Sequence, residues 1–289
     1  MKIFKSPRVL ITLSMAIFGT LAPFVRNVGL SSGEIALYRA VTAIMLIGAF
    51  LAVTGKGLPI QNIARRIPLL VLSGVAMGFN WILLFEAYKY TTVSVATLSY
   101  YFAPVIVTVV SPFLFREKLT FRQAICFIMS TLGIVLITGL GGNSPAPNHL
   151  LGILFGLGAA VLYAAVVLIN KFISGITGIH RTFMQFVAAA VVLAPYVALT
   201  SGFNLPQNGF IGWASLVTVG IVHTGITYCM YFSALGGLTG QKAAILSYID
   251  PLVAVIISVT LLGEPLTLPQ AVGGALILGF TLYNELSEK

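Results

Sequence analysis

The segment Glu117–Ala124 reads EKLTFRQA, and Glu264–Ala271, which lies 147 positions later, reads EPLTLPQA. Both copies follow the pattern E-x-L-T-x-x-Q-A. The same offset, without a gap, also pairs Gly78 with Gly225, Phe85 with Phe232, Tyr101 with Tyr248 and Pro104 with Pro251. So many identities at one constant spacing indicate an internal duplication. We therefore interpret the chain as two copies, residues 1–140 and 149–289, joined by a segment rich in Gly, Pro and Asn.

The composition around this repeat is that of a membrane protein. Of the 289 residues, 58% are hydrophobic and only 8% are charged. A soluble domain carries about 25% charged residues because its surface faces water. Since a helix needs about 20 apolar residues to cross a bilayer, hydropathy predicts ten spans, at residues 9–25, 34–53, 67–88, 92–115, 121–139, 149–169, 182–200, 210–234, 241–262 and 268–284.

The basic residues predict the orientation of these spans. With the N-terminus inside, thirteen of the 16 Lys and Arg residues fall at the inner face, and only Arg26 and Lys89 fall in outer loops. This bias follows the positive-inside rule and predicts a cell (inner) membrane protein with both termini in the cytoplasm. It also accounts for the formal net charge of +9, so we do not expect nucleic acid as a partner.

Five spans per copy is an odd number, which predicts that the second copy is inverted in the membrane. The turn motif carries an independent sign of this inversion. The first copy has Arg116, Lys118 and Arg122, whereas the matching positions of the second copy are Gly263, Pro265 and Pro269. The motif persists while its positive charges are lost, as expected for a loop that moved to the outer face. Inverted repeats are typical of secondary transporters, whose sites lie near the midplane at the repeat interface.

Two five-helix halves, each with a proline in its fourth helix followed by an E-x-L-T turn, resemble the drug/metabolite transporter superfamily. The chain is most similar to the EamA branch, and it departs from the usual pattern only in having Arg116 rather than Gly before Glu117. The resemblance implies an all-α fold of ten helices, as two inverted five-helix repeats around a central cavity that opens alternately to each side. It also implies export of small solutes such as metabolites and amino acids. Further matching elements are Phe18-Gly19, Tyr38-Arg39-Ala40 and Pro104 through Gln123.

Polar groups at membrane depth are unfavourable and usually face a bundle interior or a water-filled cavity. Counting 1.5 Å per residue along each span places a set of polar and aromatic residues near the midplane. We predict that these residues bind substrate or couple its transport: Asn80, Trp81, Tyr100, Tyr101, Tyr163, His223, Tyr248 and Asp250.

Asp250 is the most informative of these residues, because it is an acid halfway through an apolar helix and its partner in the other copy is the neutral Ala103. It can serve as a proton-coupling carboxylate or as an anchor for a substrate amine. Alternatively, it is a buried acid that only holds the fold. His223 can be its partner or a second titrating group, since histidine changes charge near neutral pH; it can equally be a core histidine with satisfied hydrogen bonds.

Three charged residues are expected near the outer side. Arg39 can bind a substrate carboxylate through its planar guanidinium, but we favour a structural role, an ion pair with Glu34 or Glu86 at the outer rim that acts as a lock or gate. Pro104 and Pro251 each free a backbone carbonyl one turn earlier and predict helix kinks, placed beside water or ligand or needed only for packing.

These features predict a secondary transporter, most simply an exporter of amino acids or related compounds that works by alternating access and exchanges them with protons. The alternative is an importer or exchanger of a small amine or nutrient on the same fold. An intramembrane enzyme is disfavoured, because no paired catalytic groups recur. No cofactor or metal is expected, and Gly240-Gln241-Lys242-Ala243 departs from the phosphate-binding pattern G-K-[ST]. The sequence leaves the oligomeric state open.

Overall fold

A computed structural model describes residues 6–55, 57–115, 120–138, 148–235, 238 and 246–287. In these residues the chain forms helices joined by short turns, with no strand among them. The helices are α1 (Pro7–Gly19), α2 (Leu21–Asn27), α3 (Ser32–Val53), α4 (Ile60–Tyr90), α5 (Val93–Tyr100), α6 (Ala103–Phe115), α7 (Phe121–Thr138), α8 (His149–Phe172), α9 (Gly178–Thr200), η2 (Leu205–Gln207), α10 (Phe210–Thr218), η3 (Val219–Ile226), α11 (Thr227–Leu235), α13 (Ile249–Thr260) and α14 (Leu268–Ser287).

Most of these helices are long and apolar enough to cross a membrane. Seven described segments meet both criteria, and two shorter apolar helices, Phe121–Ile137 and Ile249–Thr260, accompany them. The chain is therefore a multi-span helical membrane protein. The prediction of ten spans requires α7, α13 and α14 to be counted as well, and the predicted span 241–262 begins outside the described residues.

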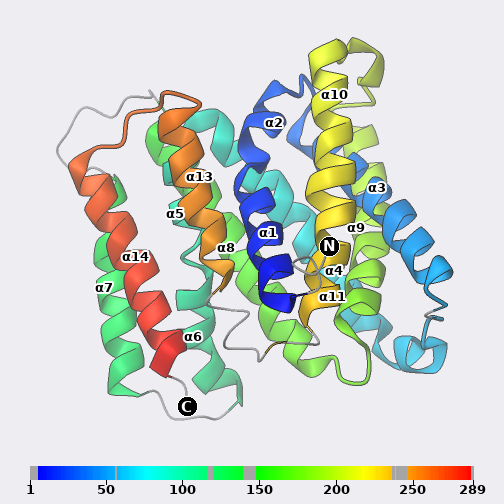
Figure 1. Cartoon of the computed structure of the whole chain (residues 1–289), viewed down its shortest axis with the longest axis horizontal. Helices are drawn as coiled ribbons and strands as arrows, with labels where there is room; N and C mark the ends of the chain where they lie inside the picture. Colours follow the sequence, from blue (N-terminus) through cyan, green and yellow to red (C-terminus); the bar gives the residue numbers. More distant parts are fainter. Residues whose placement is uncertain are drawn as a thin grey trace.

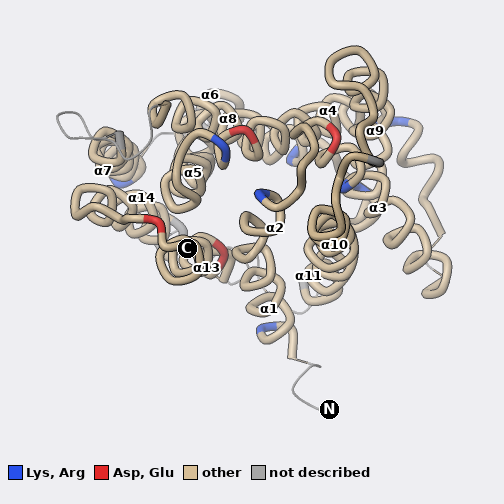
Figure 2. The backbone as a smooth tube through the Cα atoms, turned by 90° about the horizontal axis from the view of Figure 1, so that it is seen from above, with Lys and Arg blue, Asp and Glu red and all other residues tan. Residues whose placement is uncertain are grey.

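The contacts between helices follow the sequence repeat. α4 packs against α8 and α9, and the helices 147 positions further on, α10, η3 and α11, pack against α1 and α3. In the same way α5 contacts α13, and α7 lies along α14 at one end of the molecule (Figures 1 and 2). Helices of each copy therefore pack against helices of the other copy, and the two copies do not form two separate bundles.

Pro104 and Pro251 occupy matched positions in the fourth predicted span of each copy, and the structure places each of them in the first turn of a new helix. Between α5 and α6 the chain turns at Tyr101 and Phe102, so that Pro104 is the second residue of α6. Tyr248 likewise precedes α13, in which Pro251 is the third residue. Proline is tolerated in a first turn because the N–H it lacks has no partner there. The predicted kink in the first copy is therefore a full break, and a matched tyrosine lies just before each proline helix.

A π-helix, η3, interrupts the span from Phe210 to Ala234. The hydroxyl groups of Thr224 and Thr227 donate to the carbonyl oxygens of Val219 (2.8 Å) and Val222 (2.6 Å), each five residues earlier. Two glycines let α3 approach closely: a Cβ at Gly220 would lie 2.8 Å from the Thr42 hydroxyl oxygen. One at Gly225 would lie 2.1 Å from Leu46 Cδ1. Such π-helical segments often occur at functional sites.

We expect the crossing of α7 and α14 to depend on a pair of facing glycines. A Cβ at Gly133 would lie 2.6 Å from the Gly273 carbonyl oxygen, whereas one at Gly279, also in α14, would meet nothing within 4 Å. Gly133→Val should therefore lower the free energy of unfolding by about 1–3 kcal/mol through overpacking, and Gly279→Val should change it little. Thermal denaturation of the detergent-purified variants measures both. Equal melting temperatures for the two variants would show that this crossing tolerates a side chain.

Candidate functional site

Asp250, in the first turn of α13, forms the central polar contact between the two copies. The Tyr101 hydroxyl group, at the break between α5 and α6, donates a hydrogen bond of 2.7 Å to Asp250 Oδ2. On the neighbouring helix, a Cβ at Gly19 would lie 2.6 Å from the Asp250 carbonyl oxygen, so α1 packs directly on this turn. The carboxyl group thus lies where a broken helix of one copy meets the proline helix of the other.

Three further tyrosines lie next to this bond or one ring away from it. The Tyr101 ring centroid lies 5.8 Å from that of Tyr100 and 6.4 Å from that of Tyr248. Tyr100 in turn lies 5.4 Å from Tyr163, which is 40% exposed. The structure therefore brings five of the eight predicted midplane residues into one group. An aromatic group of this kind offers apolar faces together with hydroxyl groups.

Arg39 lies in the interior of the protein, with 4% of its surface exposed. Its Nε donates 2.9 Å to the Thr224 hydroxyl oxygen, and its guanidinium carbon lies 4.5 Å from the ring centroid of Trp81. Among the described residues it forms no ion pair. Its guanidinium carbon also lies 5.9 Å from the ring centroid of Phe85. A cation at this depth is expensive and is a functional-site candidate by default.

The predicted ion pair of Arg39 with Glu34 or Glu86 is wrong. Glu34 accepts hydrogen bonds from the Ser31 amide and hydroxyl groups (3.2 and 3.0 Å) and from the Asn204 amide (2.6 Å), so it caps the start of α3. Glu86 pairs with Lys89 at 2.9 Å at the end of α4. The sequence Ser31-Ser-Gly-Glu34 carries the capping-box signature, and that local signal identifies the role of Glu34.

Two further predicted residues lie apart from Asp250. Asn80 Nδ2 donates 2.6 Å to the Ala159 carbonyl oxygen and so joins α4 to α8. His223 Nε2 lies 3.1 Å from the Thr20 hydroxyl oxygen, and its Nδ1 lies 3.3 Å from the Thr218 carbonyl oxygen. The hydrogen bonds of His223 therefore connect η3 to the break between α1 and α2. They do not include Asp250, and they match the alternative of a core histidine with satisfied hydrogen bonds.

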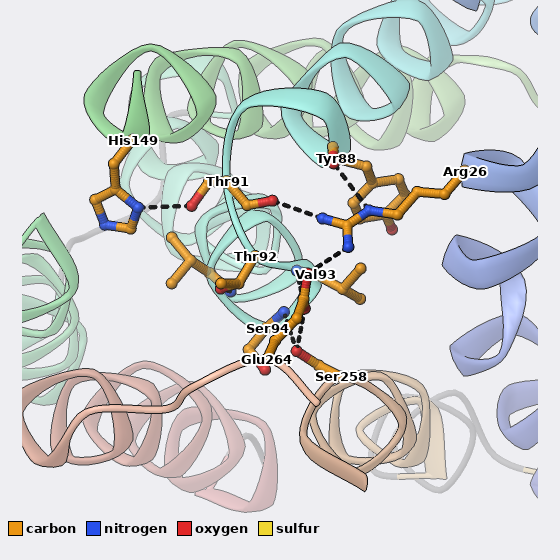
Figure 3. Close-up of polar contacts among 10 residues, drawn as sticks. Arg26, Tyr88, Thr91, Thr92, Val93, Ser94, His149, Ser258 and Glu264 are labelled. Atoms are coloured by element: carbon orange, nitrogen blue, oxygen red, sulfur yellow. Dashed lines mark hydrogen bonds and ion pairs between the residues drawn. The ribbon is translucent and has the colours of Figure 1, made fainter. Parts of the chain in front are cut away.

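A polar cluster that the sequence analysis missed lies at the end of the molecule where α2 and α13 finish (Figure 3). Arg26, the basic residue of the first predicted outer loop, forms an ion pair with Glu264, the acid of the second E-x-L-T turn. The available signal was that this turn kept its acid while losing its positive charges. Within the described residues, no group of three His, Cys, Asp or Glu side chains could hold a metal ion.

A pocket of about 390 Å³ lies away from the central tyrosines, between α1, α3, η3 and α11. Its lining is almost entirely apolar, with Leu46, Phe50 and Met230 among its residues, and contains none of the predicted site residues. We therefore place the candidate site at Asp250, Arg39 and the surrounding aromatic residues.

Comparison with known proteins identifies the family of the chain. The model of the EamA-like transporter family matches the chain twice, over residues 6–139 and 150–284. This protein belongs to the EamA-like transporter family. The resemblance inferred from the repeat and its turn motifs is thereby confirmed.

Relatives that match over most of their length are described as transporters. The chain is 30% identical to the uncharacterized transporter YxxF of Bacillus subtilis, over 92% of this chain and 85% of that protein. It is also 30% identical to an uncharacterized transporter of Archaeoglobus fulgidus, over 94% of this chain and 93% of that protein. A solved crystal structure with 21% identity superposes with a TM-score of 0.65, covering 98% of this chain and 99% of that one, and so shares the fold.

Proposed function

We propose that this EamA-family protein is a secondary transporter that exports amino acids or related small metabolites by alternating access, in exchange for protons. The observation that carries the proposal is a pair of opposite charges inside the helix bundle, which form no ion pair with each other among the described residues. Asp250 accepts a hydrogen bond from Tyr101, and Arg39 lies over the ring of Trp81. Ten spans in two inverted five-helix repeats are part of this proposal, and the reciprocal packing of matched helices supports them.

The two charges match the two ends of an amino acid. Arg39 presents a planar guanidinium, whose fork suits a carboxylate. Its hydrogen bond to Thr224 uses only Nε, which leaves the terminal nitrogens to receive the substrate. Asp250 presents a carboxylate for the substrate ammonium group, and the rings of Trp81, Tyr100 and Tyr101 supply apolar faces for its side chain. A buried cation or anion without a partner is costly, and a zwitterion supplies a partner to both at once.

Asp250 can also couple the flux to protons. Its carboxylate can hold either a proton or the substrate ammonium group, but not both together. Binding of substrate on one side then requires release of the proton, and rebinding of a proton on the other side releases the substrate. An acidic exterior would therefore drive export. The alternative, import or exchange of a small amine or nutrient, uses the same site in the opposite direction.

A binding comparison on the purified protein tests the substrate class. We expect at least one of the common amino acids to raise the melting temperature by mass action, whereas its decarboxylated amine and its deaminated acid raise it less at equal concentration. The same amino acid should then exchange against protons in proteoliposomes. Stabilisation by the amine alone, at full strength, would replace the amino-acid proposal with the amine alternative. If amino acids, amines and acids all fail to stabilise the protein, the proposed site is wrong.

A further inference from the structure

The turn between α4 and α5 is the fixed part of the cluster drawn in Figure 3. The Thr91 hydroxyl oxygen lies 2.7 Å from His149 Nδ1, and a Cβ at Gly152 would lie 2.7 Å from Thr91 Cβ. Both partners belong to the first turn of α8. This turn is therefore held tightly against α8. It presents backbone carbonyl groups at the end of α4 and a backbone amide group at the start of α5.

Arg26 and Glu264 bind these two ends according to charge. Arg26 donates to the carbonyl oxygens of Tyr88 (3.0 Å) and Thr91 (2.8 Å), at the carbonyl end of α4. Glu264 accepts from the Val93 amide (2.7 Å), at the amide end of α5. Cations are favoured at helix C-termini and anions at helix N-termini. The ion pair between Arg26 and Glu264 completes a closed loop of contacts that joins α2 to the segment after α13.

Beneath the ion pair a row of hydroxyl groups leads inward. The Ser258 hydroxyl group donates to Glu264 and accepts from the Ser94 amide at 3.2 Å. Ser258 lies eight residues from Asp250 along α13, or about 12 Å at 1.5 Å per residue. On α5, Ser94 and Thr97 are buried on the helical face that leads to Tyr101. Within the described residues the Ser94 hydroxyl group has no hydrogen-bond partner, so it is available to a water molecule or ligand on this face.

We propose that Arg26 and Glu264 form the outer gate of the transporter and that the structure has this gate closed above Asp250. The side chains of Arg26 and Glu264 remain 28% and 12% exposed. Ion pairs in contact with water contribute little net stability, because water replaces the contacts when they break. This pair can therefore open and close more easily than an ion pair buried in the core. The gate rests on the proposed alternating access for its purpose, but the labelling experiment that tests it needs no substrate.

The test measures how fast a buried cysteine on this path reacts from outside the cell. Cys126 and Cys229 are first replaced by alanine, and Thr97→Cys then supplies the probe beneath the ion pair. In intact cells, a membrane-impermeant maleimide should label this cysteine slowly. Arg26→Gln and Glu264→Gln should each increase the labelling rate about tenfold or more. The charge-swapped pair, Arg26→Glu with Glu264→Arg, should not restore slow labelling, because each new charge faces the wrong backbone end.

Two matched controls separate gating from general loosening. Lys89→Gln removes the neighbouring ion pair with Glu86 at the same end. Lys171→Gln removes a bond of 3.3 Å to Ser111, the residue that matches Ser258 in the first copy. Neither substitution should speed labelling from outside. If the gate variants label no faster than these controls, or label faster only in inside-out vesicles, the outer gate is wrong.

A second experiment applies even if a charge-neutral variant does not fold. A short bismaleimide joins Arg26→Cys to Glu264→Cys in the otherwise cysteine-free protein. In binding measurements from the outer side, the crosslinked protein should lose access to its site, whereas the uncrosslinked double variant should keep it. Unchanged access after complete crosslinking would overturn the proposal independently of the labelling rates.

Discussion

Asp250→Asn is expected to abolish proton-driven flux in proteoliposomes while leaving the protein folded. Asparagine has nearly the same shape, and its amide oxygen can still accept the hydrogen bond that Tyr101 donates to Asp250 over 2.7 Å. It cannot, however, take up and release a proton. Flux driven by an acidic exterior should therefore fall to the background of empty liposomes, and the dependence of substrate binding on pH should disappear with it.

The sign of the pH effect follows from the competition at this carboxyl group. Acid favours the protonated form, which has no charge to offer a substrate ammonium group, so substrate affinity in the unmodified protein should fall as the pH is lowered. Glu86→Gln is the matched control, because it neutralises an acid that pairs with Lys89 away from the tyrosines. Its flux and pH response should match those of the unmodified protein. A normal pH-dependent flux in Asp250→Asn would remove Asp250 from the coupling mechanism.

Much of the fold could be predicted because hydropathy and the repeat are strong, chain-long signals. Every predicted span coincides with helix over most of its described residues, and the exceptions are span ends and breaks such as Thr20 and Tyr101–Phe102. The breaks were harder to foresee. Pro104 and Pro251 indicate some departure from a straight helix, but whether the chain kinks or breaks depends on the neighbours that receive the freed backbone groups. The π-helix at Val219–Ile226 has no comparable signal, since it requires only one extra residue in a turn and is stabilised by its own threonines and by α3.

The sequence allowed us to predict how far along each span a candidate residue lies, but not which face of the helix its side chain occupies. Counting residues along each span placed Tyr101 and Asp250 at one level, and the structure joins them. The same counting cannot tell which face of a helix a side chain occupies. Arg39 was therefore assigned to the outer rim, although it lies over Trp81 in the interior. Asn80 and His223 were predicted at the same depth but bond to Ala159 and Thr20, because contacts between helices decide which polar groups remain available.

Arg39→Lys should weaken binding of the transported amino acid roughly 10- to 100-fold and should change binding of its decarboxylated amine less than about threefold. Lysine keeps the charge but loses the planar fork. A hydrogen bond to a charged group contributes about 1.5–3 kcal/mol, and each 1.4 kcal/mol corresponds to a tenfold change in affinity. Isothermal titration or thermal-shift titration of the two matched ligands measures the difference directly.

The comparison between the two ligands separates a carboxylate-binding role from a structural one. If Arg39 only supports Trp81 and Thr224, the amino acid and the amine should lose affinity in parallel, and the melting temperature should fall with them. Thr224→Val provides a graded control, because it removes the hydrogen bond to Nε and leaves the guanidinium in place. It should show the same selective loss as Arg39→Lys, but a smaller one. A selective loss in both variants requires a guanidinium that meets the carboxylate, since no contact with the fold distinguishes an amino acid from its amine.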